Sequence, residues 1–198
     1  MKVAIVVHGL STNYSDPSSL DNLVSPLMSM GYKFVHFRYG SLSPIKAHLN
    51  STISASLSSM LLSSSEMGDE VLLIGFSNGC AIIDLALKDN PNLRHLKVVY
   101  IAPIISPHFE LPDCVSTATV FSNRNDYIVK LLHPARYLSS FLFRRNWGTA
   151  ATQGYCGTDT RVRTIFLVDK TSNPLKQHTT GLTNSHNKRI VVDVLGSL

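Results

Sequence analysis

One short segment joins an apolar run to an apolar, helix-like segment through a serine between two glycines. Residues 70–76 read Glu-Val-Leu-Leu-Ile-Gly-Phe, which is typical of a buried strand. Residues 75–79 read Gly-Phe-Ser-Asn-Gly, and apolar residues recur at helical spacing after them. A sharp turn between strand and helix holds a serine hydroxyl clear of the backbone, and it leaves no room for side chains at Gly75 and Gly79. We therefore predict Ser77 as a nucleophile; the alternative is a glycine-rich turn without chemistry.

The N-terminal segment supplies a second motif. Residues 3–7 read Val-Ala-Ile-Val-Val, as expected of a buried strand, and His8, Gly9 and Leu10 follow directly. Together with the serine motif, this segment resembles the α/β-hydrolase superfamily and, within it, the lipase and esterase branch. The resemblance implies that the backbone N–H groups of Leu10 and Asn78 form an oxyanion hole. We interpret His8 as a histidine that braces the loop by hydrogen bonding.

Further segments fit the same fold. Apolar runs alternate with amphipathic segments, which is the pattern of a parallel sheet covered by helices on both faces. The resemblance implies an α/β-hydrolase fold with a mostly parallel central sheet flanked by helices, formed by residues 1–198 as a single domain. The other runs expected as strands are residues 33–39, 96–103, 117–122 and 162–168.

Three segments bear on how open the site is. Residues 104–116, where a cap would enter, are too short for a helical cap, so we expect a minimal version of the fold without one. Residues 141–160 could form a small flap over the site or an ordinary surface loop. The serine-rich residues 51–65 carry apolar residues at helical spacing and are interpreted as an amphipathic helix rather than a linker.

The acid of the site is expected in the loop after residues 117–122. In the α/β-hydrolase superfamily, which this chain resembles, the corresponding loop often holds the acid as Asp-x-x-Val. Asp126 and Val129 match this pattern. The alternative is that Asp126 only caps the next helix, a common role for aspartate. Asp169 also follows a predicted strand and is the reserve candidate.

The base is expected to be a histidine after the acid, because these triads follow the order Ser, Asp, His along the chain. His178 is followed by Thr-Thr-Gly-Leu, which resembles the family's pattern before a final helix. His186 is the alternative and is expected to face water. Histidine suits the role because its ordinary pKa lies near neutrality, and a buried carboxylate can fix its tautomer.

Composition narrows the possible functions. The 198 residues have a formal net charge of +5 with few tight basic pairs, so we expect no nucleic-acid partner. Three cysteines form no disulfide framework and no metal-binding spacing, so neither a metal nor another cofactor is expected. No signal peptide and no apolar run of membrane-spanning length are found, which predicts a cytoplasmic location.

The sequence therefore predicts a serine hydrolase that cleaves carboxylic esters through a Ser-His-Asp triad and an acyl-enzyme. A thioesterase or an amidase on the same scaffold is the nearest variant. A catalytically silent binding protein is the alternative of another class. Acyl length, alcohol and natural substrate leave no readable trace in the sequence, and neither does the oligomeric state.

Overall fold

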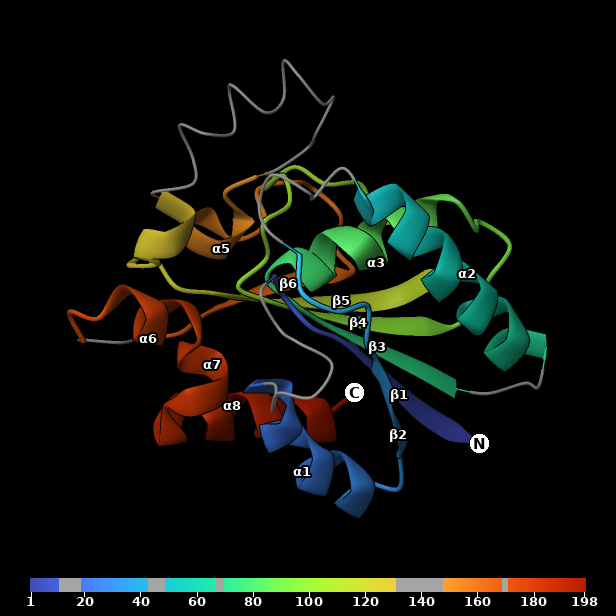
Figure 1. Ribbon diagram of the computed structural model, residues 1–198, viewed down its shortest axis with the longest axis horizontal. Helices are drawn as coiled ribbons and strands as arrows, with labels where there is room; N and C mark the ends of the chain where they lie inside the picture. The colour runs from blue at the N-terminus through green and yellow to red at the C-terminus, as the bar shows by residue number, and fades with distance from the viewer. Residues whose placement is uncertain (11–18, 43–48, 67–69, 131–147, 169–170) are drawn as a thin grey trace.

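The computed structural model describes residues 1–10, 19–42, 49–66, 70–130, 148–168 and 171–198. Within them, six strands form one sheet in the order β2-β1-β3-β4-β5-β6, and every neighbouring pair is parallel (Figure 1). The strands are β1 (Lys2–Val7), β2 (Lys33–Phe37), β3 (Glu70–Phe76), β4 (Leu96–Ile101), β5 (Val115–Ser122) and β6 (Val162–Phe166).

The central strands are apolar beyond their first one or two residues because both faces of the sheet are buried there. In β1, Val3, Ile5 and Val7 belong to one apolar core, whereas Ala4 and Val6 belong to the core on the opposite face. Successive side chains of a strand point to opposite faces, so an unbroken apolar run supplies both cores at once.

Helices cover each face of the sheet. One core includes residues of α2 and α3, and the other includes residues of η1, α1, α7 and α8, in agreement with the two helical layers in Figure 1. The helices whose bounds lie within the described residues are η1 (Ser19–Leu23), α1 (Val24–Ser29), α2 (Asn50–Glu66), α3 (Asn78–Lys88), α5 (Ala150–Gln153), α6 (Pro174–His178), α7 (Thr180–Thr183) and α8 (Ser185–Gly196).

The sequence-based fold is confirmed, with differences in detail. The serine-rich segment is the helix α2, as expected. Residues 104–116 contain no helix, as expected for a fold without a helical cap. Several strands end earlier than expected, β6 at Phe166 among them.

The described part of the segment 141–160, residues 148–160, is held against the rest of the chain by backbone hydrogen bonds. The backbone N–H groups of Gly148, Ala150 and Ala151 donate to carbonyl oxygens in residues 103–105, and both alanines are buried. This part is therefore packed against the end of β4. Residues 141–147 lie outside the described residues.

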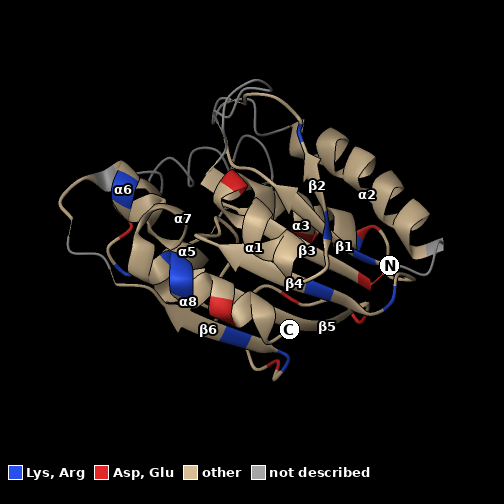
Figure 2. Ribbon diagram, turned by 90° about the horizontal axis from the view of Figure 1, so that it is seen from below, with Lys and Arg blue, Asp and Glu red and all other residues tan. Residues whose placement is uncertain are grey.

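Charged side chains are spread over several elements. Figure 2 shows basic and acidic residues interspersed along the described helices and strands. No helix in the described ranges is long and apolar enough to cross a membrane.

Candidate active site

The predicted turn around Ser77 lies between β3 and α3. Ser77 has φ 54° and ψ −117°, a left-handed conformation that costs free energy for any residue other than glycine. The surrounding backbone holds it there: the Ser77 N–H donates to the Ile101 carbonyl at 2.9 Å, and the Ser77 carbonyl accepts from the Cys80 N–H at 3.1 Å. Such strain at the end of a strand is typical of a nucleophile elbow.

Gly79 shows why this turn excludes side chains. A Cβ atom at this position would lie 2.1 Å from the carbonyl oxygen of Val7 and 2.6 Å from that of His8. Both obstacles are backbone atoms of β1 and the loop after it, so they cannot move aside as a flexible side chain could. The glycine thus lets α3 start in contact with the first strand.

We expect Gly79→Ala to lower the free energy of unfolding by about 3 kcal/mol, because it overpacks two backbone segments. For a chain of this size, that loss corresponds to a melting temperature lower by about 6–12 °C. Gly196→Ala is the matched control, since a Cβ there meets only Met30 at an ordinary contact of 3.5 Å. Equal melting temperatures for the two variants in differential scanning calorimetry would contradict this packing argument.

The structure brings the three predicted site residues together. His178 Nε2 lies 2.9 Å from Ser77 Oγ, and His178 Nδ1 lies 2.6 Å from Asp126 Oδ2. Asp126 is completely buried, and Ser77 and His178 are 8% and 7% exposed. All three belong to the edge at which parallel strands end, where open α/β sheets bind their ligands.

This geometry fixes the roles of the histidine nitrogens. A carboxylate only accepts hydrogen bonds, so Nδ1 carries a proton and donates to Asp126. In the neutral ring, Nε2 is then the acceptor of the hydrogen bond from Ser77 Oγ–H. The Phe76 ring, whose centroid lies 5.2 Å from that of the imidazole, is the apolar neighbour of this hydrogen-bonded chain.

Asp126 makes the contacts expected for both roles that the sequence left as alternatives. Oδ2 faces His178, while Oδ1 accepts a hydrogen bond from the Val129 N–H at 3.1 Å, as a helix cap does. Residues 127–130 are helical. The cap holds the carboxylate in the orientation that it needs to contact the imidazole.

His178 does not directly follow a strand. It is the last residue of α6, well beyond the end of β6. The Asn123 side chain, in the same loop as Asp126, donates to the Gln177 carbonyl at 2.9 Å and so ties α6 to the end of β5. Sequence reasoning did not single out Asn123 for this role, because no local pattern marks a contact with α6.

The alternative residues stand differently. His186 is exposed near the start of α8, as expected, and the structure does not bring it to Ser77. Asp169, the reserve acid, lies outside the described residues.

Each of the two expected oxyanion donors belongs to a segment that lies next to the serine. Asn78 begins α3 and is completely buried. Leu10 follows Gly9, whose backbone is so close to the serine that an added Cβ would lie 3.1 Å from Ser77 Cβ. His8 Nδ1 donates to the Gly9 carbonyl at 2.7 Å, consistent with the bracing role expected for this histidine. Burial lowers the pKa of His8, which favours its neutral form.

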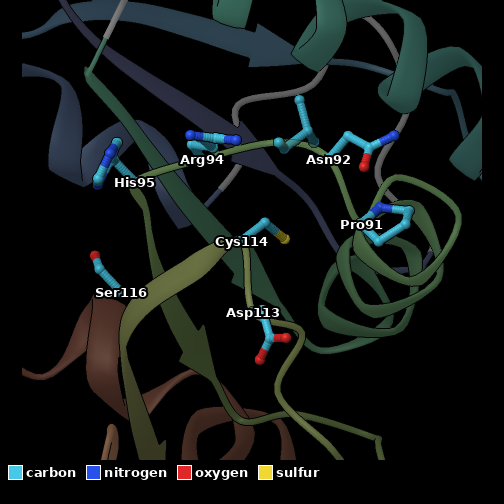
Figure 3. Close-up of a pocket in the computed structure, with 8 residues that line it drawn as sticks. Pro91, Asn92, Arg94, His95, Asp113, Cys114 and Ser116 are labelled. Carbon is cyan, nitrogen blue, oxygen red and sulfur yellow. The ribbon is translucent and has the colours of Figure 1, made fainter.

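Other parts of the described chain carry a pocket but no cluster suited to a metal ion. No cluster of three histidine, cysteine or acidic residues that could hold a metal ion occurs among the described residues. A pocket of about 530 Å³ opens where β4 and β5 begin, with Arg94, His95, Asp113 and Cys114 in its lining (Figure 3). It lies at the opposite ends of the strands from Ser77 and is separate from the site.

The fold is shared with known hydrolases. A structure of the metagenome-derived lipolytic enzymes LipS and LipT superposes with a TM-score of 0.62 at 13% identity, covering 99% of this chain and 92% of that chain. For α/β hydrolase domain-containing protein 10 from mouse, the TM-score is 0.60 at 12% identity, with 98% and 88% covered. For XC6422 from Xanthomonas campestris, a serine hydrolase without a lid, it is 0.55 at 16% identity, with 96% and 82% covered.

No protein-family model matches the sequence, and no curated protein matches it significantly. The assignment of the fold therefore depends on the similarity to these structures, at identities of 12–16%. This chain has the α/β-hydrolase fold and resembles lipolytic and esterase structures of that superfamily.

Proposed function

We propose that this chain is a serine hydrolase that cleaves carboxylic esters, with Ser77 as nucleophile, His178 as general base and Asp126 as the acid that orients it. The observation that carries the proposal is the pair of hydrogen bonds, 2.9 and 2.6 Å long, that links serine, histidine and buried carboxylate. An unassisted serine hydroxyl is a poor nucleophile at neutral pH, and this arrangement supplies the missing base.

In the first half of the proposed reaction, Ser77 Oγ attacks the ester carbonyl carbon while its proton passes to His178 Nε2. The carbonyl π electrons move onto oxygen, and the backbone N–H groups of Leu10 and Asn78 stabilise that oxyanion. Asp126 stabilises the imidazolium by charge and by its short hydrogen bond. When the carbonyl re-forms, the C–O bond to the alcohol breaks and His178 protonates the departing oxygen.

The second half repeats these steps with water. His178 Nε2 takes a proton from water as the water oxygen attacks the acyl-enzyme carbonyl, and a second oxyanion forms in the same place. Its collapse returns the proton to Ser77 Oγ and releases the carboxylic acid. A thioester or an anilide would follow the same path with a different leaving group, which makes these compounds the natural comparison.

A panel of p-nitrophenyl esters of graded acyl length, with a thioester and an anilide, tests the proposal. We expect at least one ester to be hydrolysed at least about a thousandfold faster by the wild type than by Ser77→Ala. Faster thioester or anilide turnover would favour the corresponding variant. Wild-type rates equal to those of Ser77→Ala on every compound would contradict the assignment and favour a binding protein.

A further inference from the structure

A chain of polar contacts lies behind the proposed oxyanion hole. Tyr39, which follows β2, packs its ring on that of His8 at a centroid distance of 4.1 Å and an interplanar angle of 12°. Its hydroxyl is 2.8 Å from the His8 carbonyl oxygen and 2.9 Å from that of Gly9, and donates to them. Burial raises the pKa of Tyr39 well above its ordinary value, so the hydroxyl keeps the proton that it donates.

These contacts hold the peptide between Gly9 and Leu10. The Gly9 carbonyl accepts from both the Tyr39 hydroxyl and His8 Nδ1. The same imidazole accepts from the Tyr39 N–H at Nε2, at 3.4 Å, so both its nitrogens are engaged. In a planar trans peptide the C=O and the next N–H point in opposite directions. Fixing the Gly9 carbonyl toward Tyr39 therefore fixes the Leu10 N–H away from it.

The other expected donor is tied to the same hydroxyl. The Asn78 side chain donates to Tyr39 Oη at 3.4 Å. It also forms a reciprocal pair with Asn50 at the start of α2: Asn50 Nδ2 donates to Asn78 Oδ1 at 2.9 Å, and Asn78 Nδ2 donates to Asn50 Oδ1 at 3.0 Å. Both asparagines are at least 95% buried, so removing one side chain would leave polar groups of the other without a hydrogen-bond partner.

This inference rests on the proposed function. We propose that Tyr39 and Asn50 are positioning residues that hold the Leu10 and Asn78 amides at the separation needed to bind the oxyanion. The first amide lies in the loop after β1 and the second begins α3, so no local hydrogen bond sets their separation. Tyr39 contacts both segments through one oxygen. Asn50 keeps the Asn78 side chain from turning away from that contact.

The test compares Tyr39→Phe and Asn50→Ala with the wild type, and Tyr32→Phe serves as the matched control. Tyr32 is likewise a largely buried tyrosine, but it belongs to the core on the opposite face of the sheet from α2 and α3. For each protein, kcat and KM on the best p-nitrophenyl ester are measured, together with the inhibition constant of an alkyl trifluoromethyl ketone. The Ser77 hydroxyl adds to this ketone, and the tetrahedral adduct carries an oxyanion. The melting temperature of each variant reports its loss of stability separately.

We expect Tyr39→Phe to lower kcat about 10- to 100-fold, below the cost of deleting an oxyanion donor outright, with KM within about threefold. The inhibition constant of the ketone should rise by the same factor by which kcat/KM falls, because both report the oxyanion state. Asn50→Ala should act in the same direction. The double variant should lose less than the product of the single losses, since both residues hold one network.

Wild-type kcat in both folded variants, or a lower melting temperature with an unchanged ketone inhibition constant, would reduce these residues to a structural role and overturn the inference. An equal loss in Tyr32→Phe would overturn it too. If Tyr39→Phe does not fold, Asn50→Ala alone decides. Failure of the proposed function is distinguishable, because the wild type itself would then neither turn over an ester nor bind the ketone covalently.

Discussion

Replacing His178 by alanine is expected to lower kcat by about three to six orders of magnitude, with KM within a few-fold of the wild type. Without the imidazole, no other described side chain accepts a hydrogen bond from Ser77 Oγ, so the hydroxyl would have to attack the ester without a base. The decrease in kcat is measured with discontinuous assays on the best p-nitrophenyl ester, and the rate of Ser77→Ala is subtracted.

His186→Ala is the control for this result. His186 is exposed near the start of α8, and we expect kcat and KM within a few-fold of the wild type. The reverse ranking of the two variants would move the base to His186 and contradict the proposed site.

Asp126→Asn is expected to lower kcat by about 10³–10⁴ with little change in stability. The carboxamide oxygen can keep the cap on the Val129 N–H, which leaves the amide N–H₂ facing His178 Nδ1. A donor at that position favours the tautomer protonated at Nε2, and this nitrogen then cannot take the serine proton. Loss of the cap itself would cost only about 1 kcal/mol.

Measuring kcat and melting temperature together separates these roles of Asp126. An aspartate that only capped the helix would leave kcat of the folded Asp126→Asn protein near that of the wild type. Asp169→Asn is the control variant, and we expect its kcat on the ester to equal that of the wild type. Normal turnover in Asp126→Asn with a collapse in Asp169→Asn would show that the acid is Asp169.

The parts of the site that could be predicted are those encoded within a few residues. The Ser77 turn requires a strand before it, a helix after it and glycines where backbones meet, and all of these lie within one segment. The same holds for His8, which braces its own loop through Gly9. Local order along the chain also placed Asp126 in the loop after β5.

The parts that could not be predicted depend on contacts between distant segments. The reciprocal pair of Asn50 and Asn78 joins the starts of two helices, and nothing in either local sequence marks the partner. The Asn123 contact that ties α6 to the loop of Asp126 is of the same kind. The contacts of Asp126 fit both interpretations of this residue, because a carboxylate has two oxygens and each can satisfy a different donor.

The proposal that Ser77 is an activated nucleophile can be tested by intact-protein mass spectrometry after reaction with a fluorophosphonate. We expect a single covalent adduct on the wild type, located on Ser77 by peptide mapping, and no adduct on the folded Ser77→Ala protein. A folded wild type that stays unmodified, or a Ser77→Ala protein that is still modified, would contradict it.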